Sequence, residues 1–409
     1  MTKDLINRNF EIFSVFLFSI SIFIWKPGIY VSSGIIIAYM LARLATDSSY
    51  RSDLMASKVM RVSMALFVFG LITATIGMQQ PDDLLWMARK TLFFPVAGFL
   101  FIALVRPENR KSALIGLLLG FWIASVRTLV ENWSELGNDR VAGTWPLGTW
   151  DTLLGLFFLF LVLIFDSKNL RPLIRTFVII SAVLAAVLLI LAGGRGPFLA
   201  LACAFAVYFV FYKANSRTLL FLVALFGVAV LLGTTVLHDR TQGLMHKFEL
   251  AADFTDGSNW IRIKLWGIGY EHIKELAVHQ PVSLLFGSGS KSYDQMHISF
   301  FEAMPYDEED RKKLIEYGYP SGDAHNNYID STLRNGLLWT IAAFAYLVWL
   351  TTRSTGTALS HNPAPFVMLI YFMVLAIVYT MVPHFASFFF VLFVALLSKI
   401  PPKENGENS

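Results

Sequence analysis

LIRTFVIISAVLAAVLLILAGGRGPFLALACAFAVYFVFY, residues 173–212, is the segment most informative about the fold of this chain. It contains two apolar runs, 173–192 and 196–212, which are separated by a short glycine-rich turn that holds Arg195. About 20 apolar residues in a helix are needed to cross the hydrocarbon core of a bilayer. The backbone there must be helical, because lipid cannot satisfy open hydrogen-bonding groups. The stretch therefore predicts two membrane helices joined by a tight turn.

The same pattern recurs along the 409 residues, of which 56% are hydrophobic and 36 are phenylalanine. Such a composition excludes an ordinary soluble domain. Windows of this length give about twelve spans. We expect them near 10–25, 28–45, 60–78, 84–105, 112–130, 149–166, 173–192, 196–212, 218–236, 336–352, 364–382 and 385–399. The sequence therefore predicts an all-α integral membrane protein with about twelve transmembrane helices.

Lysine and arginine are distributed unevenly between alternate connections. One set of connections carries most of them: Lys3, Arg8, Arg43, Arg51, Lys58, Arg61, Arg106, Arg110, Lys111, Lys168, Arg171, Arg175, Lys213, Arg217, Arg353, Lys399 and Lys403. The short connections on the other side hold only Lys26, Arg140 and Arg195, with Arg127 at a helix end. Since cytoplasmic loops are enriched in these residues, both termini are expected in the cytoplasm. The net charge of +4 reflects this bias and does not indicate a nucleic-acid partner.

One long polar stretch, residues 237–335, interrupts the spans. By this reading, residues 1–236 form a membrane domain of about nine helices and residues 336–399 one of about three, each helix needing some 20 residues. Residues 400–409 form a cytoplasmic tail. The long stretch faces the outer side and holds six of the eight histidines: His238, His246, His272, His279, His297 and His325. We therefore expect any chemistry to lie where this loop meets the bilayer.

The loop is predicted to be partly helical. Residues 237–255 have mixed polarity and indicate a helix along the membrane interface. Residues 256–259 supply a turn and an N-cap for a helix from Trp260 to about Ala277. We expect residues 281–322 to be less regular, with a turn at Gly-Ser-Gly-Ser, residues 287–290. A phosphate cradle there is a weaker alternative.

Arg195 is the first candidate site residue. An arginine on the outer side departs from the charge bias, and its charge near the membrane boundary is costly unless it snorkels or is paired. It could simply snorkel to the interface. Alternatively it binds an anion, in which case the glycines around it, Gly193, Gly194 and Gly196, would let a bulky ligand approach the backbone.

Three further polar residues are candidates. Arg262 lies on the predicted interfacial helix and shares a face with Trp266, four residues later. His325 precedes a span within a polar cluster, and its ordinary pKa near 6.5 suits a general base at neutral pH. Arg140 lies in a short outer loop and could contact a phosphate or a sugar. Each could also be an ordinary surface residue.

Together these residues suggest glycosyl transfer from a lipid pyrophosphate. Guanidinium groups bind phosphate in a bidentate way and remain charged, so outer arginines suit a pyrophosphate leaving group. A histidine could take the proton of an attacking hydroxyl. No DxD motif or HExxH spacing indicates a metal, and we expect neither a metal nor a cofactor.

The layout and several short motifs resemble the bacterial O-antigen ligases, within a superfamily that also contains O-antigen polymerases and protein O-oligosaccharyltransferases. The resemblance covers nearly the whole chain in topology. Its motifs are the arginine of Gly194-Arg195-Gly196, Arg262 followed by Leu265-Trp266, and His325 in Ala324-His325-Asn326-Asn327-Tyr328. Gly336 at the start of the next span and Arg140-Val141-Ala142-Gly143 are also similar.

This resemblance implies an inverting, metal-independent enzyme of the glycosyltransferase C type in the bacterial inner membrane, with its active site on the periplasmic face. Arg195 and Arg262 would bind undecaprenyl pyrophosphate, and His325 would activate the acceptor. Arg140, Asn326 and Trp266 are expected to contact substrate. The donor would be O-antigen on undecaprenyl pyrophosphate and the acceptor a sugar of lipid A-core, both presented by membrane lipids.

Other functions remain open at this stage. An O-antigen polymerase would use the same donor but add it to another lipid-linked glycan. A protein O-oligosaccharyltransferase usually has a longer C-terminal region. A transporter of lipid-linked glycans would suit twelve spans, but the chain shows no internal repeat. We also expect its spans to be nearly free of charge apart from Arg89 and Lys90.

Overall fold

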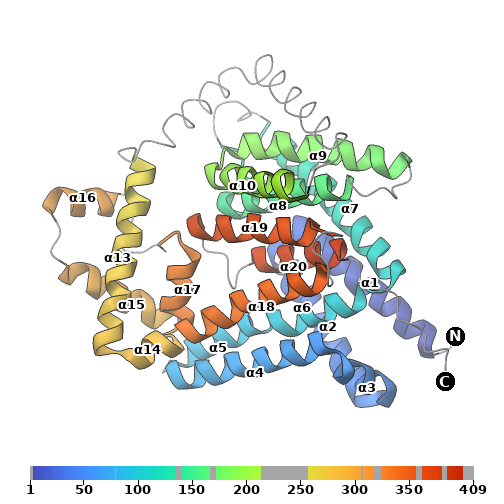
Figure 1. Ribbon diagram of the computed structural model, residues 1–409, viewed down its shortest axis with the longest axis horizontal. Coiled ribbons are helices and arrows are strands. Elements are labelled where there is room, and N and C mark those ends of the chain that lie inside the picture. Colours follow the sequence, from blue (N-terminus) through green and yellow to red (C-terminus); the bar gives the residue numbers. More distant parts are fainter. Residues whose placement is uncertain are drawn as a thin grey trace.

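The computed structural model describes residues 3–78, 80–133, 140–165, 172–212, 257–304, 307–316, 324–355, 362–379 and 385–398 (Figure 1). All regular structure in these residues is α-helical. The helices before residue 213 are α1 (Lys3–Ile24), α2 (Lys26–Thr46), α3 (Ser48–Ala56), α4 (Lys58–Gly77), α5 (Pro81–Thr91), α6 (Phe93–Ala103), α7 (Pro107–Glu131), α8 (Leu147–Phe165), α9 (Pro172–Ala192) and α10 (Arg195–Tyr212). Those after residue 256 are α13 (Gly257–His279), α14 (Pro281–Phe286), α15 (Ser290–Ala303), α16 (Glu308–Glu316), α17 (Asn327–Asn335), α18 (Leu337–Thr355), α19 (Ala364–Val378) and α20 (Phe385–Leu397).

The described helices are those of a multi-pass membrane protein. Seven segments are long and apolar enough to span a bilayer, and four shorter apolar helices accompany them. The predicted span at 218–236 and the interfacial helix at 237–255 lie outside the described residues. Every other predicted span coincides with one of these apolar helices.

The predicted span at 84–105 is broken within the membrane segment. It consists of α5 and α6, which meet at Leu92. Pro95 lies in the first turn of α6 and lacks the backbone N–H that would bond to the preceding turn. The two helices therefore form one interrupted span, Pro81–Ala103.

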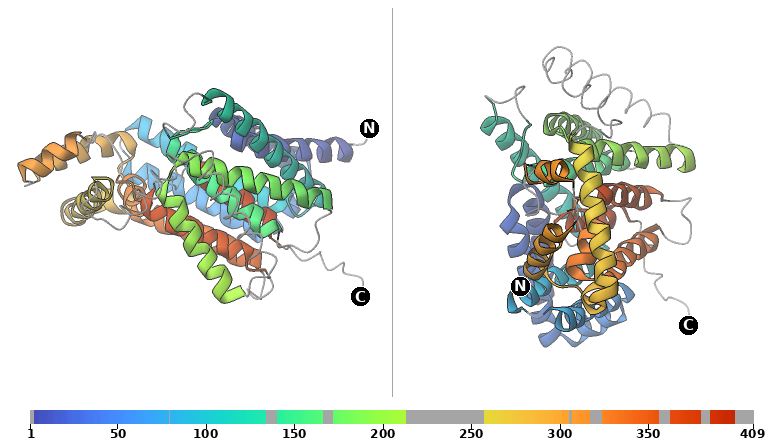
Figure 2. Two further views of the ribbon diagram at one scale, coloured as in Figure 1. Left: turned by 90° about the horizontal axis from the view of Figure 1, so that it is seen from above. Right: turned by 90° about the vertical axis from the view of Figure 1, so that its left-hand side faces the viewer.

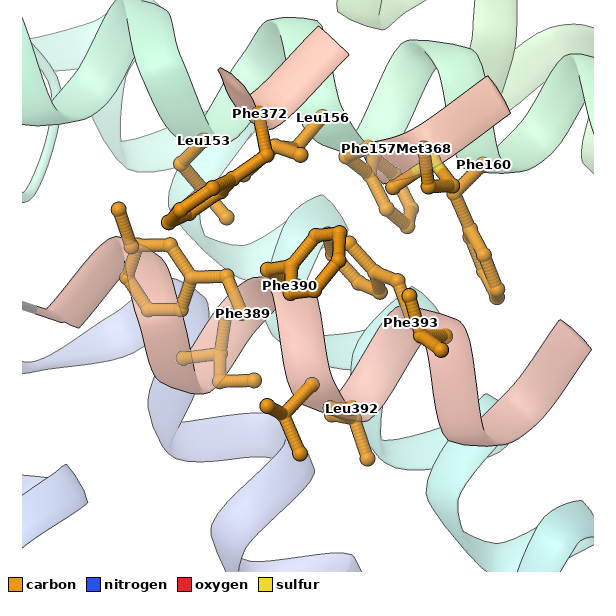
Figure 3. Close-up of a cluster of buried hydrophobic side chains, with 14 of the residues drawn as sticks. Leu153, Leu156, Phe157, Phe160, Met368, Phe372, Phe389, Phe390, Leu392 and Phe393 are labelled. Carbon is orange, nitrogen blue, oxygen red and sulfur yellow. The ribbon is translucent and has the colours of Figure 1, made fainter. Parts of the chain in front are cut away.

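Phenylalanine side chains fill the centre of the bundle between α8, α19 and α20 (Figure 3). Phe160 stacks on Phe393 with ring centroids 4.8 Å apart, and Phe372 lies 4.7 Å from Phe390. Offset and tilted pairs of this kind are favourable beyond the burial of their area. Since lipid gives helices no hydrophobic reason to associate, such packing contributes strongly to holding the spans together.

Charged residues gather at one end of the bundle, where α1 and α7 begin. Arg8 pairs with Glu108, and the Arg106 guanidinium lies 3.1 Å from Glu11. Arg110 donates hydrogen bonds to the carbonyls of Leu396 and Ser398, so the end of α20 lies here as well. The start of α1 and the end of α20 therefore share one end, as the charge bias of the connections predicts for both termini.

Helices α13 to α16 lie at the opposite end (Figure 1). The right-hand view of Figure 2 shows α13 crossing the ends of the other helices. The expectation that residues 281–322 are less regular was wrong for residues 281–303, because α14 and α15 are helical there. Long-range contacts stabilise these short helices, and a local pattern does not reveal such contacts.

The turn at residues 287–290 is a structural joint. Gly287 and Gly289 have φ values of +86° and +83°, which favour glycine. The buried Asp83 of α5 accepts hydrogen bonds from the backbone N–H groups of Lys291 and Ser292, at 2.7 and 3.2 Å. This carboxylate occupies the N-terminus of α15, so the turn docks α15 on α5 and its anion position is already filled.

Candidate active site

His325 lies in a tight turn before α17 at the outer end of the bundle. Its side chain is exposed, and its φ of +48° is in the left-handed region, which is rare for residues other than glycine. The buried Asp330 carboxylate accepts from the backbone N–H groups on both sides of the turn, those of Ala324 at 2.9 Å and Asn326 at 3.4 Å. The fold therefore holds the His325 backbone in a strained conformation, as is common at functional sites.

Asn326 is the N-cap of α17. Its side-chain oxygen accepts from the backbone N–H groups of Tyr328 and Ile329, at 3.0 and 3.2 Å. This is a common capping arrangement. Asn326, which we expected to contact substrate, thus uses its side-chain oxygen to begin the helix that follows His325.

Tyr328 ties the start of α17 to the membrane helices. Its hydroxyl donates to the carbonyl of Met373 in α19 at 3.1 Å, and its ring stacks on Phe344 of α18 with centroids 4.6 Å apart. The His325 turn is therefore anchored to the spans as well as to the outer helices.

Arg262 reaches the site from α13. Leu265 and Ile268, on the following turn, pack in one buried cluster with Ala324, the residue before His325. At Gly269, a Cβ atom would lie 2.4 Å from Cγ2 of Ile329, so α13 and α17 are in close contact. Arg262 is half-buried just before this contact.

Trp266 follows Arg262 by one turn of α13 and is half-buried. Its indole Nε1 is buried and has no hydrogen-bond partner among the described residues. A buried indole N–H usually finds an acceptor, so this donor is compatible with the expected ligand contact.

Arg195 begins α10 directly after the glycine turn. Gly193 has a φ of +66° and allows the sharp reversal from α9 into α10. The other two glycines make room for protein groups: a Cβ on Gly194 would lie 1.9 Å from Oδ2 of Asp151, and one on Gly196 would lie 2.6 Å from the Tyr379 ring. At these two positions the structure places side chains where we expected the approaching anion.

Arg140 lies against the same turn from the other side. Its Nε donates to the Ala192 carbonyl at 2.9 Å, and the N–H of Val141 donates to the Leu191 carbonyl at 3.1 Å. Its Nη2 is 3.9 Å from Oδ2 of Asp151. The outer loop that contains Arg140 is therefore hydrogen-bonded to the end of α9, next to the glycine turn that precedes Arg195.

Asp151 and Tyr379 were missed by the sequence analysis. Asp151 lies near the start of α8 and is completely buried, and the Tyr379 hydroxyl donates to its Oδ2 at 3.0 Å. Arg140 and Arg262 both act electrostatically on this carboxylate. An aspartate inside a predicted span was a usable signal, because charges in membrane segments are costly and usually functional.

The structure thus brings Arg140 and Arg262 near one buried carboxylate, against which Gly194, the residue before Arg195, also packs. Ala324, the residue before His325, packs with Leu265, which lies on the turn of α13 after Arg262. Such a group of cations suits a polyanionic ligand. Among the described residues, no group of three or more His, Cys, Asp and Glu side chains is arranged to hold a metal ion.

Residues 180–344 match a family model described as O-antigen ligase. The matched segment contains Arg195, Arg262 and His325, whereas Arg140 and Asp151 precede it. No curated protein matches the sequence.

Proposed function

We propose, from the membership of this chain in the O-antigen ligase family through residues 180–344, that it is a glycosyltransferase acting on O-antigen. It transfers the polysaccharide from undecaprenyl pyrophosphate to a sugar hydroxyl of lipid A-core. The observation that carries this proposal is the convergence of Arg140 and Arg262 on one buried carboxylate beside the Arg195 turn.

The arginines stabilise the leaving group. When the bond between the sugar and the pyrophosphate breaks, negative charge accumulates on the phosphate oxygens. Guanidinium groups donate two parallel hydrogen bonds to such oxygens and remain charged at any relevant pH. Arg195 and Arg262 are proposed to bind the pyrophosphate directly, with Arg140 beside them. Their charges replace those of a metal ion, so the proposed reaction is metal-independent.

His325 is the proposed general base. Its exposed imidazole takes the proton from the acceptor hydroxyl as the oxygen attacks the anomeric carbon. The new glycosidic bond forms on the face opposite the leaving pyrophosphate, which gives inversion. Asp330 and Asn326 hold the histidine turn in place through the hydrogen bonds described above. Trp266 is proposed to contact the lipid that carries the glycan, through its half-buried aromatic face and the N–H group of its indole.

The topology proposed for this reaction is that of an inner-membrane enzyme with a periplasmic site. The end of the bundle with Arg8, Arg43, Arg106 and Arg110 is assigned to the cytoplasm because lysine and arginine favour that side. The outer helices α13 to α16 then face the periplasm, where lipid-linked O-antigen and lipid A-core meet.

The experiment that tests the proposal is a gel of lipopolysaccharide and lipid-linked glycan from bacteria that lack this gene. Wild type, His325→Ala and His279→Ala are added back. His279 is the matched control, because it lies on α13 with its side chain 64% exposed and its nearest carboxylate, that of Glu275, at 3.7 Å.

Core-only lipopolysaccharide with accumulated long-chain lipid-linked polymer, rescued by wild type and His279→Ala but not by His325→Ala, supports a ligase with His325 as base. Lipopolysaccharide capped by a single repeat unit would instead mean a polymerase. An unchanged ladder in the deletion strain would refute the proposed function, and rescue by His325→Ala would refute the assignment of the base.

A further inference from the structure

We propose that Asp151 and Tyr379 are a positioning pair that orients the Arg140 guanidinium toward the donor pyrophosphate, an inference that rests on the function proposed above. Neither residue lies in the segment that matches the family model. The two residues are 228 positions apart in the sequence and meet through the tertiary fold.

The Asp151 carboxylate is buried at the start of α8 with few partners. Its Oδ2 accepts the hydrogen bond from the Tyr379 hydroxyl at 3.0 Å, while its Oδ1 is buried and has no hydrogen-bond partner among the described residues. A buried carboxylate with so little compensation costs free energy unless cations lie nearby. Arg140 and Arg262 are the cations that act on it, so the carboxylate and these guanidinium groups depend on one another.

The glycine turn leaves the carboxylate no room to move. Because Gly194 has no Cβ, Oδ2 of Asp151 can pack directly on the backbone between α9 and α10, and Gly196 accepts the Tyr379 ring in the same way. The pair is therefore clamped between the turn and the end of α19. The position of its charge is set by the backbone.

Arg140 is held by two different forces. The 2.9 Å hydrogen bond from its Nε to the Ala192 carbonyl fixes the position of the guanidinium. The 3.9 Å separation between its Nη2 and Asp151 is too long for a hydrogen bond. The two charges still attract at this distance, although water screens the exposed part of the Arg140 side chain. Asp151 thus orients the guanidinium, whose side chain remains 38% exposed.

Orientation of this kind matters in the transition state. A donor that already points to the site of developing charge needs no reorganisation when the sugar–phosphate bond breaks. Without the Asp151 carboxylate, the Arg140 guanidinium keeps its charge but is no longer oriented toward the pyrophosphate. The loss is therefore expected in the transfer step, with little change in binding of the lipid pyrophosphate.

The test is a double-mutant cycle on the purified full-length protein, using undecaprenyl-pyrophosphate-linked glycan as donor and lipid A-core as acceptor. Transfer is measured for wild type, Asp151→Asn, Arg140→Gln and the double variant, and binding of undecaprenyl pyrophosphate is measured without acceptor. We expect Asp151→Asn to lower kcat about 10-fold through misorientation, and Arg140→Gln to lower it about 10²-fold as for a lost charge-stabilising donor. The double variant should match Arg140→Gln within about 2-fold, because the two residues act as a unit.

Tyr379→Phe and Glu11→Gln complete the design. Tyr379→Phe removes only the hydroxyl that bonds to Asp151, and it replaces Asp151→Asn in the cycle if that variant does not fold. It should lower kcat in the wild-type background and cause no further loss of kcat in the Arg140→Gln background. Glu11 is the matched control, since it is a buried carboxylate paired with Arg106 at 3.1 Å at the opposite end of the bundle. Any effect of Glu11→Gln should simply add to that of Arg140→Gln.

Two results would overturn the inference while leaving the proposed function intact: an equal loss from Asp151→Asn in the wild-type and Arg140→Gln backgrounds, or wild-type transfer by Arg140→Gln. Failure of the proposed function looks different. In that case wild type itself binds undecaprenyl pyrophosphate but transfers no glycan to lipid A-core, whereas both results above require an active wild type.

Discussion

Asp83 and Asp151 are both almost completely buried, but their carboxylates differ in how many hydrogen bonds they accept. At the joint between α5 and α15, Asp83 accepts from two backbone N–H groups and from the hydroxyl of Ser292 at 2.7 Å. At the glycine turn, Asp151 accepts one hydrogen bond, and its second oxygen has no such partner among the described residues. A saturated carboxylate is a structural joint. A carboxylate whose charge is compensated mainly by nearby arginines can instead orient their guanidinium groups.

The largest expected effect is a loss of glycan transfer when the arginines near the glycine turn are replaced. Arg262→Ala and Arg195→Ala should each lower kcat/KM about 10²–10³-fold, because each removes a donor to the leaving pyrophosphate. The corresponding lysine variants should recover only part of the rate, since the bidentate geometry is lost. The assay is transfer of lipid-linked glycan by purified protein.

Arg8→Ala is the control for these variants, because Arg8 and its partner Glu108 are both about half exposed at the opposite end of the bundle. It should transfer at the wild-type rate. Full activity in either lysine variant would show that positive charge alone suffices, and full activity in an alanine variant would remove that arginine from the site.

The next effect is on stability, at the Asp83 joint. Asp83→Ala leaves two backbone N–H groups and a hydroxyl at the start of α15 without their acceptor. The expected loss is about 2–4 kcal/mol of unfolding free energy. Thermal unfolding in detergent measures it, and transfer per folded molecule at low temperature should stay near that of wild type. A normal unfolding temperature with a selective loss of kcat would contradict the division between the two carboxylates.

A smaller effect is a pH dependence within the outer helices. His272 of α13 and His297 of α15 are buried with their Nδ1 atoms 3.1 Å apart, and His272 stacks on Phe300. Burial lowers the pKa of His272 to about 4. Burial, followed by the charges of His272 and Arg334, lowers the pKa of His297 to about 3.

In the unfolded chain both histidines titrate near their ordinary pKa of about 6.5. Below that pH the unfolded state therefore binds protons that the folded state does not, so stability should decrease as the pH falls from 6.5 toward 4. Unfolding temperatures across this range measure the effect. His272→Phe combined with His297→Leu should flatten the curve, and an unchanged slope in that double variant would assign the dependence to carboxylates.

The smallest effect is expected next to Asp83. Lys291 pairs with Asp82 at 2.6 Å, but both side chains are about 70% exposed. Exposed pairs of this kind contribute little because water screens them, so Lys291→Ala should shift the unfolding temperature by less than about 1 °C. A shift as large as that of Asp83→Ala would mean that the charge pair, and not the capping of α15, holds the joint.

The apolar spans were predictable because their signal is local. A run such as residues 173–192 must form a helix in lipid whatever the rest of the chain does. The break at Leu92 was also visible in principle, since Pro95 lies within the run. The helices α14 and α15 were missed because their stability comes from distant residues such as Asp83, which the local sequence does not reveal.

The candidate site was predictable in part. His325 and the arginines stood out by their residue type at the edge of apolar runs, and their roles remain predictions. Asp151 was overlooked although it lies within a predicted span. Tyr379 carried no signal of its own, since a tyrosine at the end of an apolar run is common at membrane interfaces.

The amino-acid pattern alone identifies a helical membrane protein with positive charges concentrated at one end and a few arginines at the other. The physical reason is that a bilayer imposes length, polarity and charge rules on each segment separately. The pairing of each buried carboxylate with its arginine, in contrast, depends on the three-dimensional arrangement of the helices. The contact of Asp151 with Tyr379 and the left-handed turn of His325 depend on packing between segments far apart in the chain. Such packing follows from shape and hydrogen bonding in three dimensions, which no local pattern contains.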